Sequence, residues 1–391
     1  MVDVEISRQL LHRLSKWEYI WLCLLVLVIL TMHFSIITQP TELIFDEEHY
    51  VADARSILQE HDTLRPEQPP LGKLLITFGI FLFGDNPFGW RFFSIVFGTI
   101  CIVLFYLICR QLMMPKRASF LATFLLALEN LSFIQASVAM LDVFSLAFML
   151  GSFWLYLKGQ YLLSGVSVGL SALAKLSGAL ALPAILLHWL LTRRTRLRQF
   201  TSSILLAPVS FMLLMPLFDF VISRQLLNPI GQVKTMLSLS SSLTFSNTSC
   251  DIVSRPWDWI LHPEIITYWN VPHYFGAISF SIWALIIPSV LYIIFRATKS
   301  DSAGLFGISW FISTYLFWIP VSIITDRISF VYYFYPTVGA ICIGLGLGLS
   351  QLIAMWETRS AGKLRWVAML TVLGYLVLHV SIFVILSPVF N

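Results

Sequence analysis

The residues best suited to chemistry in this sequence are charged side chains that adjoin long apolar runs. Asp46, Glu47 and His49 follow the first apolar run, and Lys73 follows the pair Pro69-Pro70. The others, each at the end of an apolar run, are Arg91, Glu129, Asp142, Lys175, Asp326 and Arg327. A charged group near hydrocarbon is costly, so each of these is a candidate functional residue. Carboxylates and cations gathered at one membrane depth would suit an anionic substrate carried by a lipid.

Each of these residues also has a structural interpretation. The acidic stretch that begins at Asp46 could simply start a solvated loop, and cations at helix ends often extend to the membrane surface as anchors. Glu129 and Asp142 could pair with such cations. His49 is more often a hydrogen-bonding partner than a metal ligand, and His61 does not lie one helical turn from it, so the spacing predicts no metal site.

The composition indicates a membrane protein. The 391-residue chain is 58% hydrophobic and only 12% charged. Soluble proteins contain about 25% charged residues, so an ordinary soluble enzyme and a disordered chain are both excluded. The net charge of +4 does not indicate a nucleic-acid partner, because basic residues collect on the cytoplasmic loops of membrane proteins. We therefore expect an all-α polytopic membrane protein.

Apolar runs bounded by charge predict about eleven transmembrane helices. The predicted spans are 18–37, 88–112, 117–130, 142–158, 160–174, 178–193, 201–222, 273–296, 303–324, 328–351 and 366–387. We expect a cytoplasmic N-terminus, because this choice places most of the 25 Lys and Arg residues inside and most of the 21 acidic residues outside. The candidate residues then lie at the extracytoplasmic face.

Two predicted outer segments, 38–87 and 223–272, are too long to be turns. The first contains an apolar stretch, Leu71–Phe83, which is too short to cross a bilayer and predicts helices lying in the membrane interface. The second is polar and contains tryptophans suited to the headgroup level. Because the spans use most of the chain, we expect one integral membrane domain over residues 1–391.

Several short motifs follow one another along the sequence. The first two are Phe45-Asp46-Glu47-Glu48-His49-Tyr50 and Pro69-Pro70-Leu71-Gly72-Lys73. The others are Gly89-Trp90-Arg91-Phe92, Glu129-Asn130, Gln135, Met140-Leu141-Asp142, Gly169, Ala174-Lys175-Leu176-Ser177-Gly178, Asn228-Pro229-Ile230, Ser254-Arg255-Pro256-Trp257-Asp258-Trp259, Arg327, Tyr332-Tyr333 and Pro336. Together and in this order, these motifs resemble the protein O-mannosyltransferase family, glycosyltransferase family 39, and the likeness extends over residues 45–340.

The resemblance implies a glycosyltransferase of fold class C that moves a sugar, typically mannose, from a polyprenyl-phosphate carrier to Ser or Thr hydroxyls with inversion. By position in the motif, Asp46 would take the acceptor proton, and Glu47 would orient the acceptor or hold the loop. Arg91 would be the first cation for the departing phosphate and Arg327 the second, because a guanidinium binds phosphate bidentately. Weaker phosphate candidates are Lys175 and Lys73, and supporting residues are His49, Glu129 and Asp142.

The sequence departs from the family pattern around the expected sugar and phosphate. Gln68 stands where members commonly have His before Pro-Pro, and Glu129 replaces an Asp. Ser137 stands where Arg is expected, and Leu176 where Trp is expected. The identity of the sugar and of the carrier therefore stays open. Eukaryotic members carry a lumenal β-trefoil that the segment 223–272 is too short to hold, so we expect a short, prokaryotic-type enzyme of the cell membrane.

Three other functions stay open. The same donor chemistry could serve a lipid or envelope-glycan acceptor, as in related lipid A-modifying transferases. A transporter could use the outer charges to bind an anion, but we find neither paired broken helices nor charge at mid-span depth. The third possible function is that of a structural subunit that has lost catalytic activity. The expected partners are a polyprenyl-phosphate-linked sugar, a protein acceptor and membrane lipids. No cofactor is required, although a divalent cation could bridge Asp46 and the donor phosphate.

Overall fold

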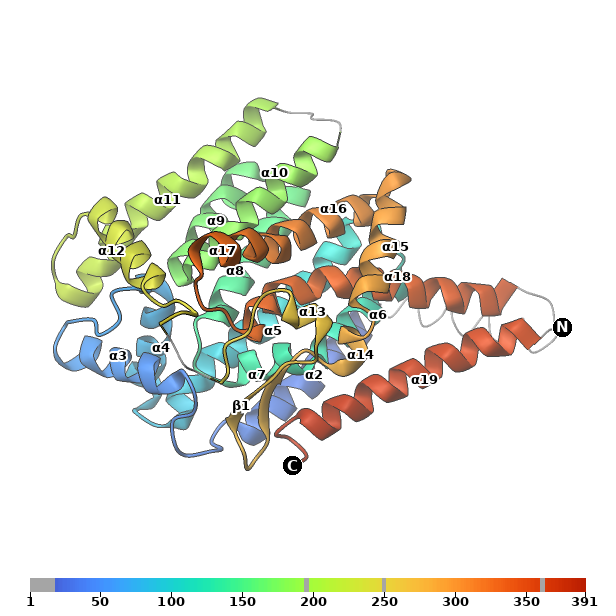
Figure 1. Cartoon of the computed structure of the whole chain (residues 1–391), viewed down its shortest axis with the longest axis horizontal. Helices are drawn as coiled ribbons and strands as arrows, with labels where there is room; N and C mark the ends of the chain where they lie inside the picture. Colours follow the sequence, from blue (N-terminus) through green and yellow to red (C-terminus); the bar gives the residue numbers. More distant parts are fainter. Residues whose placement is uncertain (1–17, 193–196, 248–250, 359–362) are drawn as a thin grey trace.

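The computed structural model describes residues 18–192, 197–247, 251–358 and 363–391 (Figure 1). Its regular structure is helical apart from one two-stranded sheet. The helices of the first half are α2 (Glu18–Ile36), α3 (Glu47–Gln59), α4 (Pro70–Phe83), α5 (Pro87–Gln111), α6 (Lys116–Ala127), α7 (Asn130–Ser137), α8 (Asp142–Leu157), α9 (Tyr161–Ala174), η1 (Leu176–Leu180) and α10 (Ala181–Leu191). Those of the second half are α11 (Leu197–Ser223), α12 (Pro229–Ser241), α13 (Asp258–Leu261), α14 (Phe280–Trp283), α15 (Ile286–Thr298), α16 (Ser302–Phe311), η2 (Ile312–Leu316), α17 (Trp318–Thr325), η3 (Val331–Phe334), α18 (Tyr335–Thr358) and α19 (Lys363–Leu386).

The described residues contain six helical segments that are long and apolar enough to cross a membrane. They are Glu18–Ile36, Pro87–Gln111, Leu197–Ser223, Ser302–Thr325, Val331–Glu357 and Arg365–Leu386. A seventh results if α6 and α7, which bend by 58° at their junction, form one span. The predicted spans 142–158, 160–174, 178–193 and 273–296 contain apolar helices of only 10–17 residues. The multi-pass prediction is confirmed, but the count falls from about eleven to six or seven, because a straight crossing needs about 20 residues.

The predicted span 273–296 is wrong at its beginning. Strand β1 (Ile265–Trp269) pairs antiparallel with β2 (Tyr274–Ala277), with a bulge between Thr267 and Trp269. Only after this hairpin do α14 and α15 begin. Aromatic residues favour strands, and Pro272 cannot donate a backbone hydrogen bond. A short apolar run alone does not distinguish a strand from a helix.

The first outer segment forms the two helices α3 and α4, so the prediction of helices within 38–87 is confirmed. Pro70 occupies the first turn of α4, where a missing N–H is tolerated. The side chain of Asn86 accepts a hydrogen bond of 3.1 Å from Gly89 N and caps α5. The position of α3 and α4 relative to the membrane interface stays a prediction.

Close helix packing holds the elements that carry the site. Helix α9 packs against α8 and α11, and α18 packs against α6. A Cβ on Gly346 of α18 would lie 2.6 Å from the Cβ of Ala122 on α6. Gly169 of α9 is likewise in close contact with Ser210 of α11. Small residues let membrane helices approach closely, and here they fix helices near the cavity described below.

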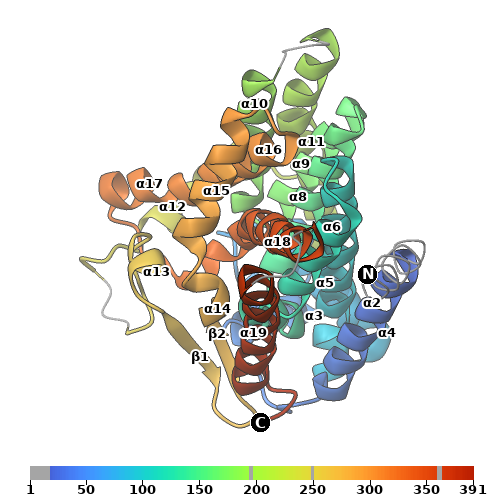
Figure 2. The same ribbon diagram turned by 90° about the vertical axis from the view of Figure 1, so that its right-hand side faces the viewer.

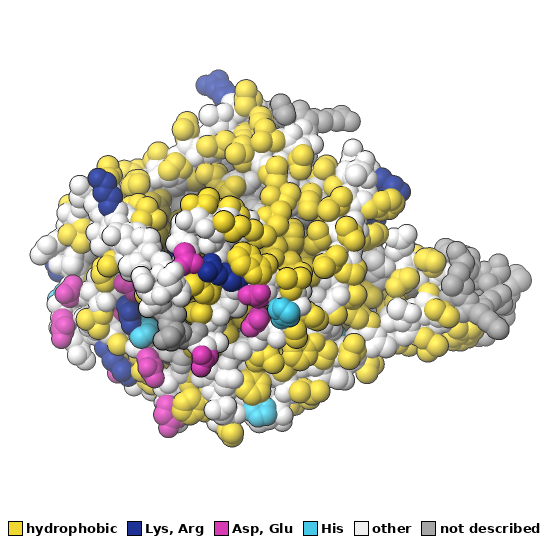
Figure 3. Space-filling model, viewed as in Figure 1, with side chains coloured by type: hydrophobic (Ala, Val, Ile, Leu, Met, Phe, Trp, Pro, Cys, Tyr) yellow, Lys and Arg dark blue, Asp and Glu magenta, His cyan; other side chains and the backbone are white. Residues whose placement is uncertain are grey.

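The arrangement separates two ends of the molecule. Figures 1 and 2 place the C-terminal end of α10 and the N-terminal end of α11 at one end and the β hairpin at the opposite end. Figure 3 shows hydrophobic side chains over much of one face, as expected for contact with lipid. Part of the sidedness prediction depends on basic residues outside the described residues: Arg8, Arg13, Lys16, Arg193, Arg194, Arg196 and Arg359. The cytoplasmic N-terminus therefore stays a prediction.

Candidate active site

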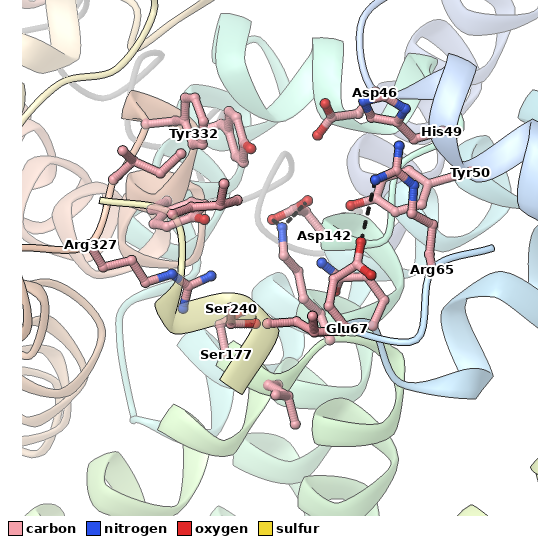
Figure 4. Close-up of a pocket in the computed structure, with 18 of the residues that line it drawn as sticks. Asp46, His49, Tyr50, Arg65, Glu67, Asp142, Ser177, Ser240, Arg327 and Tyr332 are labelled. Carbon is pink, nitrogen blue, oxygen red and sulfur yellow. Dashed lines mark hydrogen bonds and ion pairs between the residues drawn. The ribbon is translucent and has the colours of Figure 1, made fainter. Parts of the chain in front are cut away.

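A cavity of about 470 Å³ opens among α3, the loop before α4, α8, η1, the end of α12 and the segment before α18 (Figure 4). Five of the predicted site residues line it, and these are Asp46, His49, Asp142, Lys175 and Arg327. They come from segments far apart in the sequence. The fold therefore brings together both carboxylates and cations, as the sequence pattern predicts.

Asp46 lies immediately before α3, where its carboxylate does not cap the helix and makes no hydrogen bond within the described residues. Figure 4 shows the carboxylate directed into the cavity. Burial raises its pKa above the usual range, although the charge of Lys175 opposes this shift. The preceding residue, Phe45, has a φ of 51°, and its ring stacks on Tyr268 at 4.1 Å between centroids. This stacking fixes an unusual backbone conformation beside a carboxylate that is free to accept a proton.

Asp142 and Lys175 form an ion pair on the cavity wall. Lys175 Nζ lies 2.8 Å from Asp142 Oδ1 and 2.7 Å from Oδ2. The ammonium group also lies 5.3 Å from the ring centroid of Tyr332 and 5.5 Å from that of Tyr333. Burial alone would lower the pKa of Lys175, but Asp142, Tyr333 and Asp46 together outweigh burial, and the pKa lies above its usual value. Lys175 therefore stays charged while Asp142 neutralises it locally.

Arg327 is the cation of the cavity wall that has no carboxylate partner among the described residues. Its Nε is buried without a hydrogen-bond partner. Its backbone is fixed by a bridge to Thr244, and Ile328 N donates a hydrogen bond of 3.1 Å to Leu243 O. Figure 4 shows its guanidinium across the cavity from Asp46. An unpaired guanidinium held in this way is suited to binding an anion.

Arg91 and Glu47 lie outside the cavity lining and are fully buried. Arg91 donates two hydrogen bonds of 2.8 Å to the Glu47 carboxylate. It also donates to the backbone carbonyls of residues 37, 39, 40 and 42. Glu47 in turn accepts a hydrogen bond of 2.8 Å from Ala139 N. The pair thus ties together the turn between α2 and α3, α5, and the segment before α8. The Arg91 guanidinium, our first choice for the phosphate, is already occupied by protein partners.

Lys73 and Glu129 also lie outside the lining. Lys73 Nζ lies 3.5 Å from Asp53 Oδ2 and is buried. Glu129 caps α7 by accepting hydrogen bonds from Leu131 N and Ser132 N, and it accepts another from Ser279 N at 2.9 Å. These contacts favour structural roles for both side chains.

Several further residues line the cavity that the sequence pattern does not single out. Arg65 and Glu67 reach it from the loop before Pro69, and Ser240 reaches it from the end of α12. The signal available for the first two was their place just before the Pro69-Pro70 motif. Among the described residues, no three His, Cys, Asp or Glu side chains come together in a way that could hold a metal ion.

Part of this chain is similar in sequence to known mannosyltransferases. Residues 67–222 match the sequence family described as dolichyl-phosphate-mannose-protein mannosyltransferase. A polyprenol-phosphate-mannose–protein mannosyltransferase of Mycobacterium tuberculosis is 33% identical over 150 residues, which is 37% of this chain and 29% of the relative. The chain thus matches less than a third of that relative's length. The resemblance inferred from the motifs is confirmed for the matched segment, which begins after Asp46.

Solved structures share the fold. A protein O-mannosyltransferase complex of S. cerevisiae bound to the sugar donor superposes with a TM-score of 0.78 at 11% identity, over 95% of this chain and 90% of the other. ArnT from Cupriavidus metallidurans bound to undecaprenyl phosphate gives 0.62 at 18% identity, over 95% and 75%. The predicted class C architecture is therefore confirmed as a fold. At these identities the likeness does not extend to activity.

Proposed function

We propose that this chain transfers a sugar, with mannose as the first candidate, from a polyprenyl-phosphate carrier to Ser or Thr hydroxyls of proteins at the extracytoplasmic face of the cell membrane. The observation that supports this most strongly is that one cavity contains both a carboxylate and a guanidinium that have no hydrogen-bonded or ionic partner among the described residues. The Asp46 carboxylate is free to accept a proton, and the Arg327 guanidinium is free to bind an anion.

The proposed reaction is a single displacement at the anomeric carbon. The acceptor hydroxyl oxygen attacks this carbon while its proton passes to the Asp46 carboxylate. The bond between the anomeric carbon and the phosphate oxygen breaks, and the electron pair leaves with the polyprenyl phosphate. An alcohol is a weak nucleophile at neutral pH, so the base is needed as the new bond forms. The configuration at the anomeric carbon inverts, and no covalent enzyme intermediate is required.

Arg327 would act on the leaving group. The carrier phosphate gains negative charge as the sugar departs, so a fixed cation beside it stabilises the transition state more than the ground state. Arg327 thereby takes the role that the sequence pattern gave first to Arg91. The pair formed by Asp142 and Lys175 would set the charge near Asp46, and His49 would support the same wall. Glu47 and Arg91 would hold the loop that carries Asp46.

The similarity in fold to ArnT bound to undecaprenyl phosphate supports the carrier class and leaves a second acceptor class open. The same donor site and the same base could serve a hydroxyl of a lipid or an envelope glycan. The chemistry at Asp46 would not change, because only the group that carries the hydroxyl differs.

The test is a comparison of cells with and without this chain. Mass spectrometry of envelope proteins and of extracted envelope lipids would report the acceptor and the sugar together. Hexose on Ser or Thr that disappears with the chain, and returns with the wild type but not with Asp46→Asn, supports the proposal. Loss of a sugar from lipid alone would select the second acceptor class. If neither fraction changed, the proposed transferase activity would be contradicted.

A further inference from the structure

The loop between α3 and α4 brings the charged side chains of Arg65 and Glu67 to the cavity. Arg65 Nη1 and Glu67 Oε1 are 3.6 Å apart, which is longer than a hydrogen bond. Both side chains are partly exposed, at 33% and 25%. The Arg65 guanidinium is therefore held only weakly and can turn toward an anion that enters the cavity.

The buried ion pair of Asp53 and Lys73 fixes the backbone of Arg65 through hydrogen bonds. Asp53 Oδ1 accepts hydrogen bonds from Leu64 N at 2.6 Å and from Arg65 N at 3.3 Å. Lys73 Nζ donates to Arg65 O at 3.0 Å and to the Thr63 hydroxyl at 2.6 Å. Both the N–H and the C=O of Arg65 are thus bound by the pair. The Asp53 and Lys73 side chains are 0% and 2% exposed.

Stability alone does not explain such a pair. The cost of removing two charges from water offsets most of their attraction, and apolar residues of similar size are often equally stabilising. An apolar pair would not supply the hydrogen bonds that fix residues 63–65. The distinctive effect of Asp53 and Lys73 is therefore to hold the backbone from which Arg65 projects.

We propose that Asp53 and Lys73 are positioning residues that hold Arg65 as a second cation for the donor phosphate. This inference rests on the proposed function, because it requires a phosphate-linked carrier in the cavity. Figure 4 shows Arg65 and Arg327 on opposite sides of the cavity, with Asp142 between them. Two guanidinium groups approaching from opposite walls can contact different oxygens of one phosphate. In this arrangement Lys73 positions Arg65, and Lys73 itself does not contact the phosphate.

A second effect of Arg65 falls on Asp46. The charged groups that act on Asp46 are Lys175, Asp142, His49 and Arg65, and Arg65 lowers the pKa of Asp46. Removing Arg65 therefore raises that pKa. Because the base works only when deprotonated, the acid limb of the pH–rate profile moves to higher pH. A variant that merely displaces Arg65 moves the limb in the same direction.

The first experiment measures binding of a short-chain polyprenyl phosphate to the purified full-length protein. Arg65→Ala is expected to weaken binding about tenfold or more, as for loss of a charge-assisted hydrogen bond. Arg55→Ala is the matched control, because Arg55 pairs with Asp85 at 2.8 Å outside the cavity lining, and we expect its affinity to be unchanged. Normal binding by Arg65→Ala together with weakened binding by Arg327→Ala would overturn the inference and leave the proposed function intact. Normal binding by both variants would instead remove the proposed phosphate site.

The second experiment tests the positioning role with a double-mutant cycle. Lys73→Met is expected to weaken binding and to move the acid limb upward. The combined Arg65→Ala/Lys73→Met variant should bind no more weakly than Arg65→Ala alone. Losses that simply add would overturn the positioning role. Because Lys73→Met leaves the buried Asp53 carboxylate without its cation, Asp53→Asn/Lys73→Met is measured in parallel, and it must show the same non-additivity with Arg65→Ala if Lys73→Met does not fold.

Discussion

Asp46 combines burial with neighbours of both charges, so its proton affinity results from opposing effects. Burial raises its pKa, Lys175 lowers it and Asp142 raises it. A base whose pKa is moved toward neutrality removes protons more effectively near neutral pH, provided that enough of it stays deprotonated. The ion pair between Asp142 and Lys175 is placed to adjust this balance, because each member acts on Asp46 with the opposite sign.

Two substitutions in this ion pair should shift the pH dependence in opposite directions. Lys175→Met removes a cation that lowers the pKa of Asp46, so the acid limb of kcat/KM should move to higher pH. Asp142→Asn removes an anion that raises this pKa, so the limb should move to lower pH. Profiles measured on both purified variants with the same donor check the signs. A shift of both variants in one direction would show that Asp46 does not control the limb.

For single residues, the sequence predicted which residue types belong to the site better than it predicted which groups their side chains contact. The predicted spans put Asp46, Asp142, Lys175 and Arg327 at one face of the membrane, and all four line the cavity. The motif could not show that Arg91 points away into a buried ion pair, because a motif specifies residue types but not the direction of a side chain. The place of Arg65 at the cavity could not be predicted, because Arg65 lies in a loop, where no periodic pattern indicates which side chains face the cavity.

At the scale of elements, the turn before α3 is held by Arg91 of α5. Its guanidinium binds Glu47 and the carbonyls of residues 37, 39, 40 and 42, so one side chain supports most of the turn that carries Asp46. A buried charge whose partner is removed is strongly destabilising. An alanine substitution at a phosphate-binding residue would instead mainly weaken binding of the donor.

Arg91→Ala should therefore lower stability and not donor affinity. Loss of the buried pair is expected to cost about 3–5 kcal/mol. Thermal unfolding of the detergent-purified protein would report this as a lower Tm, while binding of polyprenyl phosphate to the remaining folded protein should be unchanged. A normal Tm with weakened binding would return Arg91 to the phosphate site that the sequence pattern first suggested.

The elements themselves were predictable where the apolar pattern was long. Helix α5 lies within one residue of the predicted span at both ends. The hairpin of β1 and β2 was missed because strands of four and five residues carry too little pattern to distinguish them from a helix. The helices α8, α9 and α10 were recognised as helices, but the sequence pattern overestimated how many helices are long enough to cross a bilayer unaided.

At the scale of the whole molecule, the proposed function requires the cavity to open on the extracytoplasmic side. The distribution of Lys and Arg favours this orientation, because cytoplasmic loops are enriched in both. Composition was sufficient to predict a multi-pass membrane protein, since 58% hydrophobic and 12% charged residues depart strongly from the roughly 25% charged residues of typical soluble proteins.

Cysteine labelling can test this orientation. In a background whose native cysteines are replaced, Glu60→Cys lies at the end of α3 beside the cavity loop, and Ser300→Cys lies between α15 and α16; both positions are exposed. A membrane-impermeant maleimide should label Glu60→Cys in intact cells and Ser300→Cys only after permeabilisation. The reverse pattern would place the cavity on the cytoplasmic side and would contradict the proposed location.

The measurement that tests the central claim most directly is donor turnover by purified Asp46→Asn beside its binding of polyprenyl phosphate. The substitution preserves size but removes the proton acceptor. We expect turnover to fall by about a hundredfold or more, as for loss of a general base, while polyprenyl phosphate binds as tightly as it does to the wild type. Turnover at the wild-type rate would contradict the claim that Asp46 is the base.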